Sequence, residues 1–371
     1  MKLATFNVEN MFERPKVMNL SNWKMGKQTL EDYKQLNELI QKTVYTPSVK
    51  SSILNIMNRH KGLLTQKKSA FIQLNDLHGK FLKKPKGKPY QIIANGRSGW
   101  LGWFELINEA VSEPATENTA RIIDLVHADV QCVVEVENRI VLKRFNADIF
   151  KKIKAKPFDH VMVIDGNDER GIDVGIMTRE GYEIICMLSH VDDWDKKGEI
   201  FSRDCAEYEI NTPKGNHLLL LVNHFKSKGY GKPAQSNAKR LRQTTRVREI
   251  YDSYIKAGYE YIAVLGDFNE IPANSSLDPL LRNGSTLTDI MSHPKFQGSG
   301  RPGTYRNMTK NEKLDYILMS PKLSAKVITG DIECQGVWGG KNGTLFPHLK
   351  TINSETEAAS DHAALWVELD I

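Results

Sequence analysis

The amino-acid sequence predicts a sheet-rich α/β or α+β protein whose core is interrupted by a basic insertion after the first strand. Short apolar segments of strand length recur along most of the 371 residues. Few long helical segments separate them, as expected for sheets with helices packed outside. Residues 14–115 break this pattern and carry the excess positive charge. We interpret residues 1–371 as one large domain containing an insertion at 14–115.

The composition is that of a folded globular protein. Hydrophobic residues make up 40% of the chain and charged residues 26%, which excludes a mainly disordered, collagen-like or disulfide-dense protein. The longest aliphatic run, Leu218 to Val222, is far shorter than the ~20 residues that cross a bilayer. The N-terminus lacks the apolar segment of a signal peptide. With four scattered cysteines, we expect free thiols, a cytoplasmic location and no membrane partner.

The elements are predicted in chain order from the spacing of apolar residues. A first strand at 2–7 ends in polar residues, and a helix at 116–128 leads into a strand at 130–135 that ends in a carboxylate. A long helix is expected at about 234–256. Further strands are predicted at 160–164, 172–178, 182–188, 205–210, 217–223, 261–266, 314–319 and 363–369.

The insertion is predicted to be partly helical, with helices at 29–42 and 48–60 and an exposed Lys/Pro/Gly loop at 80–89. Its aromatic cluster at 99–104 either packs or presents aromatic faces to bases, and we expect packing for most of it. Between Arg14 and Trp100 there are 17 lysines and arginines against four acids, a net +13, whereas the rest of the chain is −7. This charge indicates either a polyanion partner, most often nucleic acid, or a solvated lysine-rich surface.

Polar residues adjoin five of the predicted apolar strands. Each would more often be an ordinary turn residue, but together they describe an acidic pocket with two histidines. Such a pocket suits Mg²⁺, which prefers oxygen ligands, better than zinc, because there is no cysteine cluster. The residues are Asn7, Glu135, Asn223, His224, Asp267, Asn269, Asp361 and His362.

These residues lie in motifs that resemble the endonuclease/exonuclease/phosphatase superfamily, whose members include deoxyribonuclease-I-like nucleases. The motifs are Asn7, Glu135 to Asn138, Asn223 to Lys228, Gly266 to Asn269, Lys313 to Leu318, and Ser360 to His362. They occur in the family's order and span all of the chain except the insertion. The resemblance implies a four-layer α/β/β/α sandwich and a metal-dependent phosphoester hydrolase.

The resemblance also implies a ligand set for Mg²⁺ or Mn²⁺. Glu135 resembles the main metal carboxylate, and Asn7 resembles the neighbour that holds the metal or its water. Asp361 would lie beside the metal.

The catalytic roles are implied in the same way. Asp267 and Asn269 resemble the pair that orients the attacking water and the phosphate. His362 resembles the catalytic histidine, which Asp315 would orient, and His224 resembles a second histidine that can protonate the leaving oxygen. In-line hydrolysis of a phosphodiester needs each of these functions.

The sequence departs from one branch of the superfamily. Exonuclease-III-type enzymes place a tyrosine where this chain has Ile172, which argues against abasic-site specificity. Nearby, Arg170 is a candidate to bind phosphate, or else it forms a surface salt bridge with Asp168 or Glu169.

Further candidates for phosphate or nucleic-acid binding are Lys226, Lys83 and Lys84, together with Arg242. Residues 239, 242 and 246 share one helix face, which either lines the groove of the site or is simply exposed.

We therefore expect a metal-dependent nuclease acting on DNA, with RNA as a second polymer substrate. The alternatives are a phosphomonoesterase, inositol-phosphate or lipid phosphodiesterase of the same superfamily, or a catalytically silent nucleic-acid-binding module. Both ends of the insertion are expected at the catalytic edge, where a basic wall would hold the nucleic-acid backbone. No obligate protein partner is inferred.

Overall fold

The computed structural model describes residues 1–20, 23–111, 113–229, 232–298 and 300–371. The chain divides into two compact units. The core unit comprises Met1–Phe12 and Ser112–Ile371, and the inserted unit comprises Glu13–Val111. The predicted insertion at 14–115 differs from the inserted unit by a few residues at each end. Each unit is described here by itself.

Two six-stranded mixed sheets form the centre of the core unit. The first has the strand order β19-β20-β1-β8-β10-β9 and the second β11-β14-β15-β16-β18-β17. In these orders the strands of the first sheet are Val327–Glu333, Ala364–Leu369, Lys2–Met11, Val130–Val136, Asp173–Thr178 and His160–Ile164. Those of the second are Glu183–Leu188, Cys205–Asn211, His217–His224, Tyr261–Asp267, Asp315–Met319 and Thr288–Asp289.

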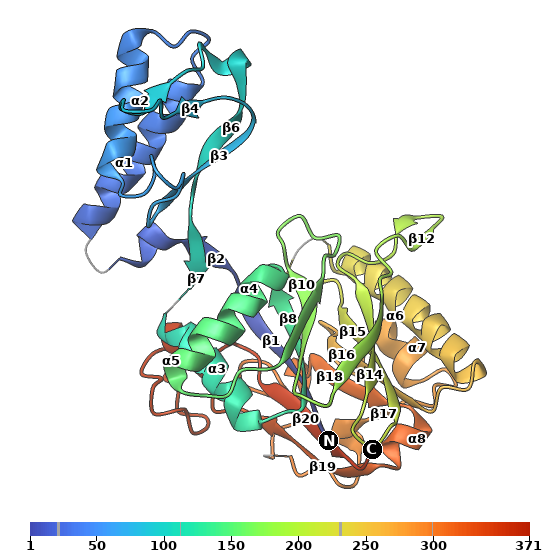
Figure 1. The fold of residues 1–371 in the computed structure, drawn as a ribbon. Helices are drawn as coiled ribbons and strands as arrows, with labels where there is room; N and C mark the ends of the chain where they lie inside the picture. The colour runs from blue at the N-terminus through green and yellow to red at the C-terminus, as the bar shows by residue number, and fades with distance from the viewer. Residues whose placement is uncertain (21–22, 112, 230–231, 299) are drawn as a thin grey trace. The chain divides into compact units, whose positions relative to one another are not determined.

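The two sheets pack face to face, with helices on their outer faces (Figure 1). Inward-facing side chains of both sheets, such as Val134 and Leu220, form one continuous core. On the outer face of the second sheet, α6 (Pro233–Lys256) buries Val247 and Tyr251 against strand residues that include Leu221. On the first sheet, α3 (Pro114–Val126) contacts β1 and β20. This is the predicted four-layer α/β/β/α sandwich.

The predicted strands and the long helix of the core unit agree with the structure to within one or two residues, except that β1 continues to Met11. Sequence patterns missed β19, whose glycine and two acids interrupt the apolar alternation. They also missed β17, the hairpin of β12 (Trp194–Asp195) and β13 (Gly198–Glu199), and short helical segments. These segments are α4 (Arg139–Arg144), the π-helix Phe145–Ile149, α5 (Phe150–Ile153), α7 (Asp278–Leu281) and α8 (Pro321–Ser324). Elements this short leave too few periodic positions to detect.

The inserted unit has its own apolar core. The helices α1 (Trp23–Ile40) and α2 (Pro47–Arg59) pack with the antiparallel pair β3 (Ile72–Gly79) and β6 (Trp100–Leu106). Shorter pairs are β2 (Glu13–Pro15) with β7 (Asn108–Ala110), and β4 (Leu82–Lys83) with β5 (Gln91–Ile92).

The exposed loop predicted at 80–89 is only partly correct, because Phe81 is fully buried. Its ring stacks on Trp100 with centroids 4.0 Å apart, and Phe104 meets it edge-on. Most of the aromatic cluster therefore packs, as expected, while Trp103 remains 41% exposed. No helix within the described ranges is long and apolar enough to cross a membrane.

Candidate active site

Strand pairing brings the predicted polar residues to one edge of the core unit. In the first sheet β1 and β8 run parallel with Asn7 opposite Val134, and the pairing becomes irregular after Asn7, so Asn7 and Glu135 lie near each other where β8 ends. In the second sheet His224 lies opposite Asp267, which in turn lies opposite Asp315. Carboxyl ends of parallel strands share an edge, which is why residues far apart in sequence meet here.

An asparagine connects the two sheets at this edge. The Asn7 amide nitrogen donates to Glu135 Oε1 at 3.2 Å and to Asp267 Oδ2 at 3.1 Å. The Asn7 amide oxygen accepts the backbone N–H of Glu9 at 3.0 Å. Asn7 thus holds two carboxylates from different sheets close together.

The backbone around the site adopts conformations that few residues tolerate. Glu135 and Asn269 have φ values of 69° and 53°, in the left-handed region. Such strain is kept where the surrounding structure enforces it, often at functional sites. Gly266 has φ 124°, and a Cβ there would lie 2.0 Å from the carbonyl oxygen of Asn223, so only glycine fits before Asp267.

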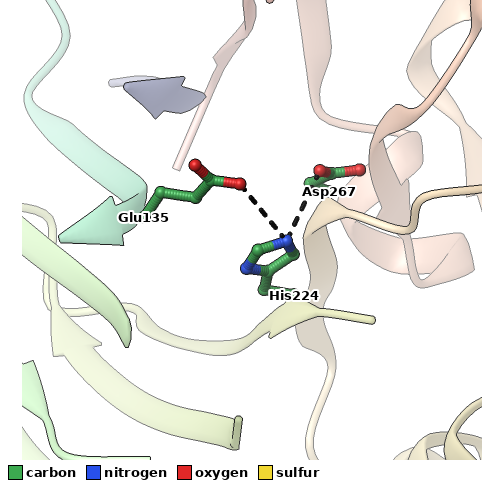
Figure 2. Close-up of side chains that lie close together, drawn as sticks. All are labelled: Glu135, His224 and Asp267. Carbon is green, nitrogen blue, oxygen red and sulfur yellow. Dashed lines mark ion pairs between the residues drawn. The ribbon is translucent and has the colours of Figure 1, made fainter. Parts of the chain in front are cut away.

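His224 lies between two carboxylates (Figure 2). Its Nε2 is 3.6 Å from Glu135 Oε1 and 3.7 Å from Asp267 Oδ2. The side chain is buried, and its Nδ1 has no hydrogen-bond partner among the residues that the structure describes. Burial, followed by the nearby cations Arg203 and His362, lowers the pKa of His224 well below its usual value. Glu135, His224 and Asp267 each offer one ligand atom, and these atoms lie within 4.8 Å of one another, so the group could hold a metal ion.

His362 forms a second pair beside this cluster. Its Nδ1–H donates to Asp315 Oδ2 at 2.8 Å, and the same oxygen accepts the hydroxyl of Thr304 at 2.6 Å. The opposite ring nitrogen, Nε2, is 3.9 Å from both Asp267 Oδ2 and Asp361 Oδ1. Burial alone would lower the pKa of His362, but Asp315 and Asp267 outweigh it and raise that pKa to about 10. Burial raises the pKa of Asp267, against the opposing effect of His362.

Asn269 supports the shared carboxylate from the other side. Its backbone N–H donates to Asp267 Oδ1 at 2.7 Å and its side-chain amide to Asp267 Oδ2 at 3.0 Å. The same amide also donates to the carbonyl of Phe225 at 3.2 Å. Asp267 is therefore oriented by hydrogen bonds from Asn7 and Asn269.

A cavity of about 480 Å³, which is also lined by cations, opens onto Glu135, His224, Asp267, Asn269, Asp361 and His362, whereas Asn7 and Asp315 support these residues without lining it. Arg203 is buried, and its Nε lies 2.9 Å from the Asp168 carboxylate. Arg170 donates to both oxygens of the same carboxylate, at 2.9 and 2.8 Å, so it lines the cavity and also forms the predicted salt bridge. The lining residues are Glu9, Glu135, Arg170, Ile172, Arg203, His224, Ser227, Lys228, Gly229, Asp267, Asn269, Tyr305, Arg306, Leu314, Asp361 and His362.

Comparisons with known proteins agree with this arrangement. A sequence profile described as the Endonuclease/Exonuclease/phosphatase family matches residues 105–328, more than half of the chain. The chain belongs to this family. Its members are in general phosphoester hydrolases, and they typically use divalent metals. No curated protein matches the chain in sequence.

Solved structures of the family share the fold at low sequence identity. An endonuclease/exonuclease/phosphatase family protein from Bacteroides thetaiotaomicron is 18% identical, with a TM-score of 0.50. The match covers 69% of this chain and 85% of that one. A mannosyl-6-phosphatase from the same organism is 17% identical, with a TM-score of 0.50, and the match covers 69% and 91%. At these identities the likeness shows the fold alone.

Within this family fold, sequence reasoning missed several residues that line the cavity. Arg203, Tyr305 and Arg306 stand in irregular segments that carry no motif. The ring of Tyr305 lies 4.8 Å from that of His362, and these two residues form an isolated backbone bridge. Glu9 lies beyond residue 7, the predicted end of β1, so it has no place among the predicted site residues. For Glu9, the one signal in the sequence is that a polar residue stands close to the predicted end of a strand.

Arg242, a predicted nucleic-acid contact, lies outside the cavity. Its guanidinium donates to both oxygens of Asp195 at 2.6 Å and to the carbonyls of Gly198 and Glu199. On the same helix face Lys239 donates to the carbonyl of Glu199, and Arg246 pairs with Asp193 at 2.7 Å. The basic face of α6 thus binds the acidic segment around β12 and β13. Lys239, Arg242 and Arg246 are not among the residues that line the cavity, and their binding to nucleic acid stays a prediction.

Lys226, in the core unit, is not among the residues that line this cavity. Lys226 directly follows the strand end at His224 and Phe225, and its backbone N–H donates to Gln243 Oε1 at 2.9 Å. Burial, followed by Arg203 and Arg170, lowers the pKa of Lys226. Lys83 is in β4 of the inserted unit, and the Nζ of Lys84 lies 5.1 Å above the ring of Tyr90 in that unit.

Proposed function

We propose that the core unit is a Mg²⁺- or Mn²⁺-dependent phosphodiesterase and that its substrate is nucleic acid, DNA in the first place. The observation that carries this proposal is the convergence, in one cavity, of the Glu135–His224–Asp267 group and of His362, whose ring is held from behind the cavity wall by Asp315. Membership of a family of phosphoester hydrolases supports the reaction class, and the charge of the inserted unit supports a polyanionic substrate.

The residues present fit a hard divalent cation. Two carboxylate oxygens, from Glu135 and Asp267, are drawn together by one amide in a largely buried setting, where their mutual repulsion is costly. Oxygen donors are the ligands that Mg²⁺ and Mn²⁺ prefer. We assign Glu135 and Asp267 as the ligands, with Asp361 beside them and Asn7 as the residue that positions both carboxylates. When bound, the cation supplies charge neutralisation at the phosphoryl oxygens and an acidified water.

The histidines supply and direct the proton. Asp315 fixes the ring of His362 through Nδ1, which leaves Nε2 facing the cavity with a proton to donate. The leaving alkoxide of a phosphodiester needs such a donor. The resemblance gives His224 the role of protonating the leaving oxygen, but burial lowers its pKa and leaves the ring neutral. We therefore assign His224, buried between Glu135 and Asp267, to accept a proton from the attacking water instead.

The arginines that line the cavity complement a phosphate. Arg203 is buried and held by Asp168, so its guanidinium is oriented before substrate arrives. Arg170, on the same carboxylate, is a second donor to phosphoryl oxygens.

The positive net charge of the inserted unit favours a polymeric substrate over a small phosphate ester. It carries 17 lysines and arginines against seven acids, a net +10, whereas the core unit is −4. Met11 pairs with Val136, the residue after Glu135, so the chain leaves the core unit at the strand end that carries the site. We propose that the lysines of this unit, Lys83 and Lys84 among them, bind the nucleic-acid backbone.

One experiment tests the proposal and its alternatives. The full chain is incubated with plasmid, single-stranded DNA, RNA, bis-p-nitrophenyl phosphate and a panel of phosphomonoesters and phospholipids, in Mg²⁺, Mn²⁺ or EDTA. His362→Ala is the inactivating variant, and His160→Ala, on an exposed strand position, is the matched control. We expect metal-dependent cleavage of nucleic acid that His362→Ala abolishes. Hydrolysis of monoesters or lipids alone would show that the enzyme is a phosphomonoesterase or lipid phosphodiesterase and not a nuclease. Binding of nucleic acid without hydrolysis of any substrate would indicate a catalytically silent binding module.

A further inference from the structure

A second cavity, of about 410 Å³, adjoins the catalytic cavity in the core unit. Both are lined by Glu9, Arg306 and Asp361, which therefore stand at the border between them. The volume lies within the ~300–1,000 Å³ typical of small-molecule sites. The residues that line only the second cavity include Asn307, Trp338, Gly340, Lys341 and Glu355.

Backbone hydrogen bonds fix this border in place. The N–H of Arg306 donates to the carbonyl of Asp361 at 2.8 Å, and the N–H of Asp361 donates to Glu9 Oε2 at 2.9 Å. The N–H of Gly340 donates to Asn307 Oδ1 at 2.8 Å, which ties the far wall to the same segment. Hydrogen bonds therefore join three segments that are distant in sequence, around Glu9, Arg306 and Asp361, at this border.

The border also contains unusual backbone conformations. The φ values of Glu9 and Arg306 are 52° and 45°, both in the left-handed region. Neither residue is glycine, asparagine or aspartate, which tolerate that region best. Strain of this kind persists at ligand-binding segments because the surrounding hydrogen bonds enforce it.

The cations of the second cavity are placed to receive an anion. The side chain of Arg306 is 64% exposed, and its Nε is 3.7 Å from the Asp361 carboxylate, too far for a good hydrogen bond. The guanidinium lies over the ring of Tyr305, 5.0 Å from the centroid, which holds it at the border. Lys341 supplies a second positive charge on the far wall.

The remaining lining groups suit a nucleoside better than a lone phosphate. Trp338 supplies an aromatic wall and is itself stacked on His348, with centroids 5.1 Å apart and planes 17° apart. The carboxylates of Glu9, Glu355 and Asp361 would repel a free anion, but they accept hydrogen bonds from sugar hydroxyls and base amino groups. Aromatic walls beside cations are the features by which proteins hold single-stranded nucleotides.

We propose that this second cavity binds the nucleotide next to the scissile phosphate, with its base against Trp338, its outer phosphate on Lys341 and Arg306 at the border between this nucleotide and the scissile phosphate. The inference rests on the proposed function, because it assigns a subsite to that reaction. It implies that efficient cleavage requires a substrate that extends beyond one phosphodiester on the side of this cavity.

The test compares two substrates and four variants in the full chain with Mg²⁺. Bis-p-nitrophenyl phosphate offers a single phosphodiester, whereas a single-stranded trinucleotide also offers flanking nucleotides. The variants are Trp338→Ala, Trp338→Phe, Lys341→Ala and, as a matched control, Trp194→Ala, whose indole is 68% exposed in the β12–β13 hairpin. Thermal melting checks that each variant is folded.

The proposal predicts that Trp338→Ala lowers kcat/KM for the trinucleotide about tenfold more than for the small ester, in keeping with the ~5- to 150-fold cost of losing one stacked base. Lys341→Ala also lowers kcat/KM for the trinucleotide more than for the small ester, because the outer phosphate loses its cation. Trp338→Phe restores most of the trinucleotide rate, and Trp194→Ala changes neither. Equal losses on both substrates, or no loss on the trinucleotide, would overturn the subsite.

A binding measurement separates this inference from the proposed function. Thymidine 5′-monophosphate is titrated into wild type and the same variants by calorimetry in the presence of EDTA. The subsite predicts weaker binding for Trp338→Ala and Lys341→Ala, whether or not the protein cleaves nucleic acid. Undetectable or unchanged binding across the variants would overturn it. If thymidine 5′-monophosphate binds in a way that depends on Trp338 but the protein hydrolyses no nucleic acid, the subsite is supported and the proposed nuclease activity is contradicted.

Discussion

The core unit and the inserted unit use charge in opposite ways. The core unit is net acidic, and its acids converge at one sheet edge, where Asn7, Glu135 and Asp267 share hydrogen bonds. The inserted unit is net +10, and its cations are spread over a small separate fold. Converging acids create a site with defined geometry, whereas dispersed lysines create a field that attracts polyanions without fixing their position. We infer from this difference that chemistry and substrate retention are divided between the units.

The largest effect is expected from removing the oriented histidine. His362→Ala should lower kcat by about 10²–10⁴-fold, because the leaving oxygen loses its proton donor. Binding of DNA, measured by fluorescence anisotropy in the presence of EDTA, should change little. A comparable loss of binding would show that the two functions are not divided.

The next largest effect is expected from a substitution that destabilises the inserted unit and leaves the core unit folded. Phe81→Ala removes a fully buried ring that stacks on Trp100, and it should lower the free energy of unfolding of the inserted unit by ~3–5 kcal/mol. Hydrolysis of bis-p-nitrophenyl phosphate should persist, while retention of DNA weakens. Differential scanning calorimetry together with the two assays checks this expectation. Loss of small-ester hydrolysis would show that the core unit depends on the inserted one.

A smaller effect is expected from charge alone. Replacing Lys83, Lys84, Lys86 and Lys88 with alanine should flatten the dependence of DNA binding on salt, by ~0.9 in log–log slope for each duplex phosphate that the protein no longer neutralises. Removing residues 16–112 should flatten it further. The matched control is alanine at Lys239, Arg242 and Arg246, which already bind Glu199, Asp195 and Asp193. An unchanged slope in the lysine variant would assign nucleic-acid binding to another surface.

The smallest effect concerns the pH dependence of core-unit stability. Burial would lower the pKa of His190, but hydrogen bonds to Glu207 and Asp193 outweigh burial and raise that pKa. Because the pKa is higher in the folded state, the stabilisation is complete below the unfolded pKa, ~6.5. It is lost as the pH rises through the folded value.

Chemical denaturation across this pH range in wild type and His190→Gln measures the contribution. The wild type should lose more stability than the variant on going from below pH 6.5 to higher pH. Parallel pH profiles would show that His190 makes no such contribution.

The sequence predicted the site residues whose position follows directly from the apolar pattern of the strand that carries them. Buried strands leave a clear apolar signal, and a polar residue directly after such a strand, as at Glu135 or Asp267, lies at a sheet edge by construction. Arg203, Tyr305 and Arg306 come from irregular segments, and only the assembled fold brings them to the cavity. Arg242 does not line the cavity and pairs with Asp195 instead, because helical spacing gives the direction of a side chain but does not reveal the acid that faces it.

The central claim is that the edge cluster holds the divalent cation on which hydrolysis depends. It is tested most directly by Mn²⁺ binding, followed by electron paramagnetic resonance, and by hydrolysis of bis-p-nitrophenyl phosphate in the same samples of wild type and Glu135→Gln. We predict that wild type binds Mn²⁺ and hydrolyses the ester, and that the variant loses affinity and rate together. A variant that keeps wild-type Mn²⁺ affinity and rate would contradict the account.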